Sequence, residues 1–162
     1  MPEEKKIKPT IEEKAADLLS GEKLKNYLDF YQFLIANKLS KAPSNKDGTA
    51  LTIKFKNKLF CSFRVSPDSW RLSFFKYFRQ EKWYDKIEPY LSDEQKDFIC
   101  SNINIKPGCK GCDGEKELII FGKTFNNVCA CHSLLLRNPE GKALEYAKEL
   151  VLIAKKIIAE SI

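Results

Sequence analysis

Histidine is nearly absent from this chain, since His132 is the only one among 162 residues. A cysteine–histidine or serine–histidine nucleophile would have to use that single imidazole, which lies inside a cluster of cysteines, and we expect no such activity. The patterns GxxxxGK[ST], GxGxxG, HExxH and GxSxG are missing as well. The sequence therefore favours a non-enzymatic binding module over an enzyme of these classes.

Long apolar runs are also lacking. The two nearest, residues 33–40 and 151–159, are interrupted by polar and charged residues and are shorter than the ~18 residues of a membrane span. Residues 1–10 are rich in charge and do not contain the apolar segment of a secretory signal. We therefore expect a cytoplasmic protein with reduced thiols and no membrane partner.

Repeats, low-complexity tracts and long linkers are not found, and 162 residues suffice for one hydrophobic core. We expect one domain over 1–162, with a flexible tail at 1–9. The net charge is +6, and residues 42–90 hold its excess, with ten Lys and Arg against five Asp and Glu. A basic segment of this kind raises the question of which surface it forms.

Capping signals mark where two helices begin. Thr10-Ile11-Glu12-Glu13 has the form of a capping box and predicts a short helix over 11–19, and Ser92-Asp93-Glu94-Gln95 predicts another that extends toward Ser101. Between them, apolar residues at steps of three and four predict an amphipathic helix over 23–38. Asn138-Pro139 predicts an N-cap and first residue for a long final helix.

Apolar and polar residues alternate over 51–75, and two turn signals interrupt the alternation. This pattern predicts a three-stranded antiparallel meander with one wholly apolar face. The four-residue turn that contains proline pairs Val65 with Trp70, and an odd-length loop or bulge near Lys58 would set Phe55 opposite Cys61. With the helices and a second hairpin over 117–131, the fold class is α+β.

The order of amphipathic helix, meander LTIKFKNKLFCSFRVSPDSWRLSFF and helix start LSDEQKDFI resembles the small bacterial domains grouped as YdhG-like. The resemblance covers residues 20–105. It implies a compact α+β domain suspected of binding small ligands, and it supplies no catalytic residues.

Four cysteines lie close together in residues 106–132, as Cys109-x-x-Cys112 and Cys129-x-Cys131, with His132 beside the last. A two-residue turn at Gly122-Lys123 would bring the two pairs together, and four thiolates suit a closed tetrahedral zinc site. The arrangement resembles a zinc ribbon, although the second pair is C-x-C. We expect a structural zinc ion, with His132 as a substitute ligand.

Other interpretations of these cysteines stay open. A rival turn at Asn126-Asn127 would separate the two pairs, and the thiols would then be unligated or disulfide-bonded. An iron–sulfur cluster is a further alternative. Cys109 and Cys112 also have the spacing of a thiol-disulfide redox pair, but acidic residues follow them and disfavour the thiolate.

The polar face of the meander is the second candidate site. In the predicted register Arg64 lies opposite Arg71, which is unfavourable unless an anion or a carboxylate lies between them. Basic and aromatic side chains on one sheet face can hold single-stranded nucleic acid, whereas a solvated or helix-covered face is the simpler interpretation. A small-molecule ligand is the other partner considered. The candidate residues are Lys54, Lys56, Phe60, Arg64, Arg71 and Phe75.

Overall fold

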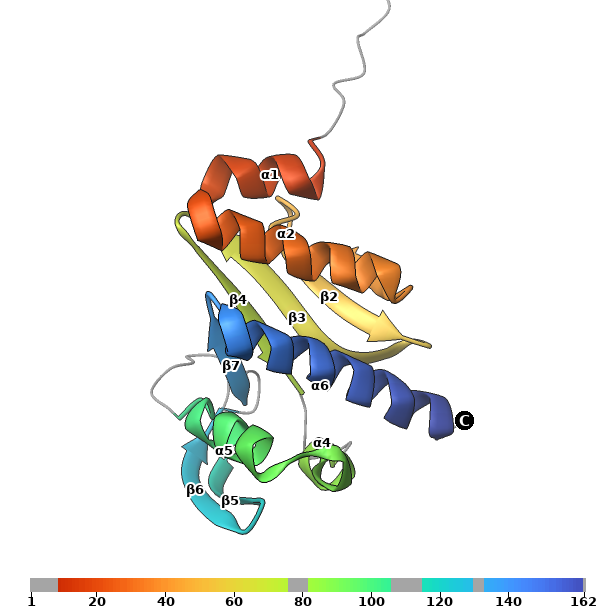
Figure 1. Ribbon diagram of the computed structural model, residues 1–162, viewed down its shortest axis with the longest axis vertical. Coiled ribbons are helices and arrows are strands. Elements are labelled where there is room, and N and C mark those ends of the chain that lie inside the picture. The colour runs from red at the N-terminus through yellow and green to blue at the C-terminus, as the bar shows by residue number, and fades with distance from the viewer. Residues whose placement is uncertain (1–8, 76–81, 106–114, 130–132, 162) are drawn as a thin grey trace, which may run out of the picture.

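The computed structural model describes residues 9–75, 82–105, 115–129 and 133–161 (Figure 1). It contains an antiparallel five-stranded sheet, a separate two-stranded hairpin and several helices, so the predicted α+β class is confirmed. The helices are α1 (Ile11–Leu18), α2 (Gly21–Ala36), α4 (Trp83–Ile87), α5 (Asp93–Ser101) and α6 (Gly141–Glu160), with the 3-10 turn η1 at Glu88–Tyr90. The strands are β1 (Ser40–Pro43), β2 (Ala50–Phe55), β3 (Lys58–Ser66), β4 (Ser69–Phe74), β5 (Glu115–Ile120), β6 (Lys123–Val128) and β7 (Leu134–Arg137).

Both predicted capping boxes are present. In the first, Thr10 Oγ1 accepts a hydrogen bond of 3.2 Å from the backbone of Glu13, whose carboxylate accepts one of 2.8 Å in return. Ser92 and Gln95 form the same reciprocal pair at the start of α5. These contacts satisfy N–H groups that a helix leaves without partners, and they explain where α1 and α5 begin. In the part of the chain that the structure describes, no helix is both long and apolar enough to cross a membrane.

The strands of the main sheet run in the order β1-β2-β3-β4-β7. The predicted pairing of Val65 with Trp70 across β3 and β4 is confirmed. The predicted pairing of Phe55 with Cys61 is wrong, because Phe55 lies opposite Lys58 and Cys61 lies opposite Ile53. The chain turns at Lys56 and Asn57, which both have positive φ. The register then shifts at a bulge that leaves Phe60 without a partner on β2.

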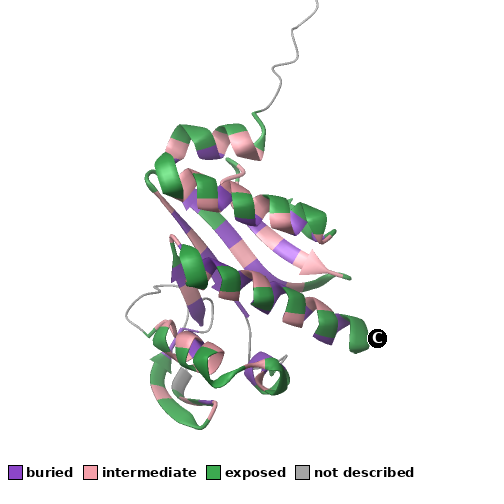
Figure 2. Cartoon of the chain, in the orientation of Figure 1, coloured by how far each residue is buried: buried purple, intermediate pink, exposed green. Residues whose placement is uncertain are grey.

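Helices α2 and α6 lie beside each other across one face of this sheet (Figure 1). Along β3 the buried residues that point toward them alternate with more exposed ones (Figure 2). Tyr27 of α2 stacks on Phe63 with 4.4 Å between ring centroids and meets Trp70 edge-on at 5.6 Å. This aromatic cluster fills the space between helix and sheet, so the apolar face of the meander is the main core of the protein.

The two edge strands β1 and β7 extend the predicted meander. β1 pairs with β2 and lies in the segment that links α2 to it, and β7 pairs with β4. The expected N-cap at Asn138 is wrong, because α6 begins at Gly141. Asn138 instead directly follows β7 with a φ of 44°: its backbone N–H donates to the carbonyl of Trp70 at 2.8 Å, and its Oδ1 accepts from the Trp70 N–H at 2.8 Å.

The hairpin of β5 and β6 lies beside α5. Its turn is Phe121-Gly122, where φ is 51° and 77°, so the expected turn at Gly122-Lys123 is wrong by one residue. The rival turn at 126–127 is also wrong, since these residues lie within β6. Residues 102–105 run between the hairpin and the main sheet, with bridges from Ile105 to Val128 and from Ile103 to Leu134.

Candidate functional site

Three arginines form a row across neighbouring strands of the main sheet. Arg71 on β4 pairs with Arg64 on β3 and also with Arg137 on β7. The side chains of residues paired in this way project from the same face of a sheet, and neighbouring strands are about 4.8 Å apart. The predicted opposition of Arg64 and Arg71 is confirmed. Arg137 was missed because β7 was not predicted, although Leu134, Leu136 and Arg137 do follow the alternation of a half-buried strand.

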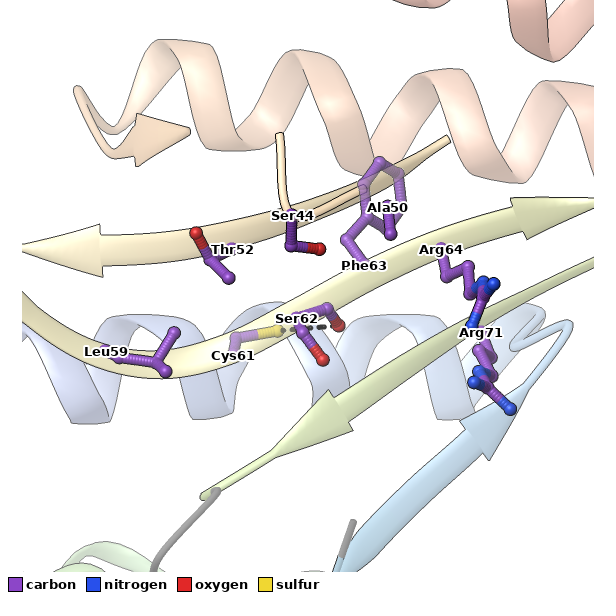
Figure 3. A pocket seen from close by; sticks show the side chains of 9 residues that line it. All are labelled: Ser44, Ala50, Thr52, Leu59, Cys61, Ser62, Phe63, Arg64 and Arg71. Carbon is purple, nitrogen blue, oxygen red and sulfur yellow. Dashed lines mark hydrogen bonds between the residues drawn. The ribbon is translucent and has the colours of Figure 1, made fainter. Parts of the chain in front are cut away.

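The arginine row lies on the face of the sheet opposite α2 and α6, here called the open face. Successive residues of a strand point to opposite faces of the sheet. Since Phe63, Val65 and Trp70 point into the core, the neighbouring Arg64 and Arg71 point to the other face. Figure 3 shows Arg64 and Arg71 projecting beside one another from this face, with the helices behind the sheet. Arg64 and Arg137 are exposed, and Arg71 between them is partly buried.

The positive charge of the row is not neutralised within the described residues. No carboxylate among them forms an ion pair with Arg64, Arg71 or Arg137. Desolvation, followed by the charges of the two flanking arginines, lowers the pKa of Arg71 below its ordinary value. A guanidinium nevertheless stays protonated at neutral pH, so three like charges remain side by side. An anion placed over Arg71 would relieve that repulsion.

Hydroxyl groups form a second row beside the first. Ser62 lies two residues from Arg64 on β3. It pairs with Thr52 of β2 on one side and with Ser73 of β4 on the other. The two rows are therefore separated by about 6.7 Å, the rise of two strand residues. Ser73 is buried, whereas Thr52 and Ser62 are partly exposed. The Thr52 hydroxyl donates to the carbonyl of Ala42 at 3.3 Å, which leaves its oxygen able to accept.

Two hollows flank the arginine row and share Arg64 and Arg71. One, of about 160 Å³, extends over the hydroxyl row, where Ser44, Thr52 and Ser62 line it (Figure 3). The other, of about 190 Å³, extends toward the β3–β4 turn, and its polar lining residues are Arg64, Ser66, Ser69, Arg71 and Arg137. Both hollows are large enough for a small group, and guanidinium and hydroxyl groups line each of them.

Phe60 and Phe75 are not exposed on this face, contrary to expectation. Both rings are fully buried, so neither is available to stack on a base. Phe60 is the residue displaced at the bulge in β3. Phe75 has a φ of 59°, and its ring lies 5.1 Å from that of Trp83. The backbone N–H of Phe75 donates to the Phe60 carbonyl at 2.8 Å, which links the two irregular positions.

The two candidate lysines lie apart from the arginines. Lys54 is on β2 two residues beyond Thr52, on the same face but farther along the sheet. Lys56 occupies the β2–β3 turn, where its Nζ lies 5.6 Å from the ring centre of Phe55. The site that the structure brings together is therefore the arginine row with the neighbouring hydroxyls.

Most of the cysteine cluster lies outside the described residues. This applies to Cys109, Cys112, Cys131 and His132, whereas Cys129 is described and fully buried. The described residues contain no group of three His, Cys, Asp or Glu side chains arranged to hold a metal ion. Burial raises the pKa of the Cys61 thiol, as expected for a buried structural cysteine and opposite to what a reactive thiolate needs.

Comparison with known proteins gives no relative for this chain: no family model, no curated protein and no solved structure matches it. The resemblance to YdhG-like domains therefore stays a prediction, and functional inference depends on the geometry of the site.

Proposed function

We propose that the protein is a non-enzymatic binding module that holds an anionic ligand on the open face of its main sheet. The observation that carries this proposal is the row of Arg64, Arg71 and Arg137, which has no acidic partner among the described residues. Hydrogen bonds from a guanidinium to an anion contribute about 1.5 to 3 kcal/mol each. An anion that contacts two or three of these arginines gains that energy and removes the repulsion between them.

Thermal unfolding in phosphate, sulfate and chloride at one fixed ionic strength tests this proposal. Phosphate and sulfate should raise the melting temperature above that in chloride, because an anion that binds only the folded state stabilises it. Arg71→Gln should reduce the difference to the general stabilisation that these two salts give by exclusion from the protein surface. Lys25→Gln is the matched control, since exposed Lys25 lies on α2, on the other side of the sheet, and its one ion pair among the described residues is with Glu22 at 3.9 Å. A difference between the salts that is as large in Arg71→Gln as in the wild type would contradict the proposal.

A structural zinc ion is the second proposal, and the positions of described residues around the cysteines favour it. Ile105 bridges to Val128, and Glu115 also pairs with Val128, so the two ends of the segment that contains Cys109 and Cys112 lie beside one residue. Cys129 follows that residue directly, and its N–H donates to the carbonyl of Asn104 at 2.9 Å. The proposed ligands are Cys109, Cys112, Cys129 and Cys131, with His132 as a substitute.

Metal analysis of protein purified without chelator tests the zinc site. We expect about one zinc ion per chain, the stoichiometry of a closed four-ligand site. Cys112→Ser should lower the melting temperature because metal binding is coupled to folding, whereas Cys100→Ser, which replaces a cysteine of α5, should not release the metal. Metal-free protein of full stability would contradict the site. Disulfide reductase activity that is lost in Cys109→Ser would instead support the thiol redox alternative.

A further inference from the structure

The arginine row and the hydroxyl row are adjacent and share one hollow, which restricts the ligand more than charge alone does. The hollow of about 160 Å³ is lined by Arg64 and Arg71 at one end and by Ser44, Thr52 and Ser62 along its length. Within the described residues, the hydroxyls of Ser44 and Ser62 have no hydrogen-bond partner. They are therefore free to bind a group that lies next to the anion.

We infer that the ligand of the open face is a small organic phosphate whose carbon skeleton carries hydroxyl groups, the class of the sugar phosphates. This inference rests on the proposed anion-binding function. The phosphate lies over the arginine row, and the hydroxylated part extends into the hollow toward Thr52 and Ser62. Two strand residues separate the rows by about 6.7 Å, a distance that a skeleton of a few carbon atoms spans.

The hydroxyl row gives the site both donors and acceptors for such a ligand. The Thr52 oxygen accepts, because its proton is donated to the carbonyl of Ala42 at 3.3 Å. Ser44 and Ser62 can donate or accept as their hydroxyls rotate. A sugar hydroxyl is also both donor and acceptor, so it satisfies these groups, whereas inorganic phosphate reaches the arginines alone.

The geometry favours a small ligand over single-stranded nucleic acid. Stacking on exposed aromatic rings supplies about 1 to 3 kcal/mol per base in proteins that bind single strands. Phe63 and Trp70, the aromatic residues in the linings of the two hollows, are each only 1% exposed. Phe60 and Phe75 are fully buried. A polynucleotide would therefore contact the arginines by its phosphates, and the described residues that line the two hollows offer its bases no exposed ring to stack on.

Calorimetric titration with inorganic phosphate, glycerol 3-phosphate, ribose 5-phosphate and a single-stranded oligonucleotide tests this inference. We expect ribose 5-phosphate to bind about tenfold more tightly than inorganic phosphate, the gain from two neutral hydrogen bonds. The variant Thr52→Val/Ser62→Ala should lose that advantage and keep its affinity for inorganic phosphate. Ser101→Ala, which replaces an exposed serine of α5 that lines neither hollow, is the matched control and should behave as the wild type.

Equal affinity for inorganic phosphate and the two organic phosphates would overturn the inference and leave the anion-binding proposal standing. An affinity for ribose 5-phosphate that Thr52→Val/Ser62→Ala leaves unchanged would overturn it as well. Oligonucleotide binding tighter than that of ribose 5-phosphate and steeply weakened by salt would assign the face to nucleic acid instead. If none of the four anions binds, the proposed function fails too. Each single substitution, Thr52→Val and Ser62→Ala, provides a milder variant with which to verify folding.

Discussion

The two faces of the main sheet differ in what they contribute to stability, although neighbouring residues of the same strand belong to opposite faces. Toward the helices, Phe63 and Trp70 are buried in an aromatic cluster with Tyr27. On the open face, Arg64 and Arg71 lie side by side, and no carboxylate of the described residues pairs with either. The core face stabilises the fold by removing apolar surface from water, and the open face opposes it by like-charge repulsion. Because the arginines of three strands lower the stability of the fold, we take this face as the candidate binding surface.

The largest expected effect comes from the core face. Phe63→Ala should lower the free energy of unfolding by about 3 to 5 kcal/mol, because it leaves a cavity beside Tyr27 and Trp70. Arg64→Ala, one residue further along β3, should change it by less than about 0.5 kcal/mol. Urea denaturation of both variants measures the contrast, and similar losses for the two would contradict the division between the faces.

Alkaline pH should destabilise the folded protein through a tyrosine of the core. Burial raises the pKa of the Tyr27 phenol well above the ordinary value of 10.0. The phenol is neutral in both states below pH 10, and above it only the unfolded chain loses the proton, so the free energy of unfolding falls as pH rises. The expected slope is about 1.4 kcal/mol per pH unit for this one group.

Denaturation from pH 8 to pH 11.5 measures that slope, with Tyr27→Phe as the matched variant. The Tyr27 hydroxyl is buried and has no hydrogen-bond partner among the described residues, so its removal should cost little at pH 8. Tyr27→Phe should reduce the slope by the contribution of one proton. Tyr84, whose pKa is raised by burial, should account for a second proton. Identical slopes in wild type and Tyr27→Phe would show that the phenol ionises with the fold intact.

Reversal of one charge on the open face should make the contribution of this face to the stability of the fold favourable. Arg71→Glu places a carboxylate between Arg64 and Arg137, and each opposite-charge pair across strands is worth about 0.2 to 1 kcal/mol. The variant should therefore be more stable than the wild type at low salt, less so at high salt, and insensitive to phosphate. Melting temperatures at two ionic strengths measure this, and a variant less stable than the wild type at low salt would argue against repulsion in the row.

The smallest effect concerns the turn between β2 and β3. Lys56 has a φ of 47°, a conformation that glycine adopts without strain. Lys56→Gly should raise the free energy of unfolding by about 0.5 kcal/mol, whereas Lys54→Gly, within β2, should lower it by about 0.5 to 1 kcal/mol. Chemical denaturation of the pair checks the signs, and a loss in both variants would mean that the Lys56 side chain contributes more than its backbone strain costs.

The sequence was sufficient where structure is local. A proline-containing turn of fixed length determined the β3–β4 register and with it the opposition of Arg64 to Arg71. The sequence did not predict the pairing of β4 with β7, which brings together residues distant in the chain. Arg137 lies 66 positions after Arg71, and a strand of four residues is too short for its alternation to identify its partner strand. Phe60 and Phe75 were misplaced for another reason. A bulge and a positive φ each interrupt strict alternation, and neither has a sequence signature here.

The contact of Asn138 with the backbone of Trp70 has a further consequence. Strand β7 is only four residues long, and a shift of one residue against β4 would exchange its two faces, sending Arg137 into the core and a leucine to the surface. Asn138 binds both the N–H and the carbonyl of Trp70, each at 2.8 Å, and thereby admits only one alignment. The backbone and the side chain of Asn138 thus fix the register of β7, and that register places Arg137 opposite Arg71 in the row.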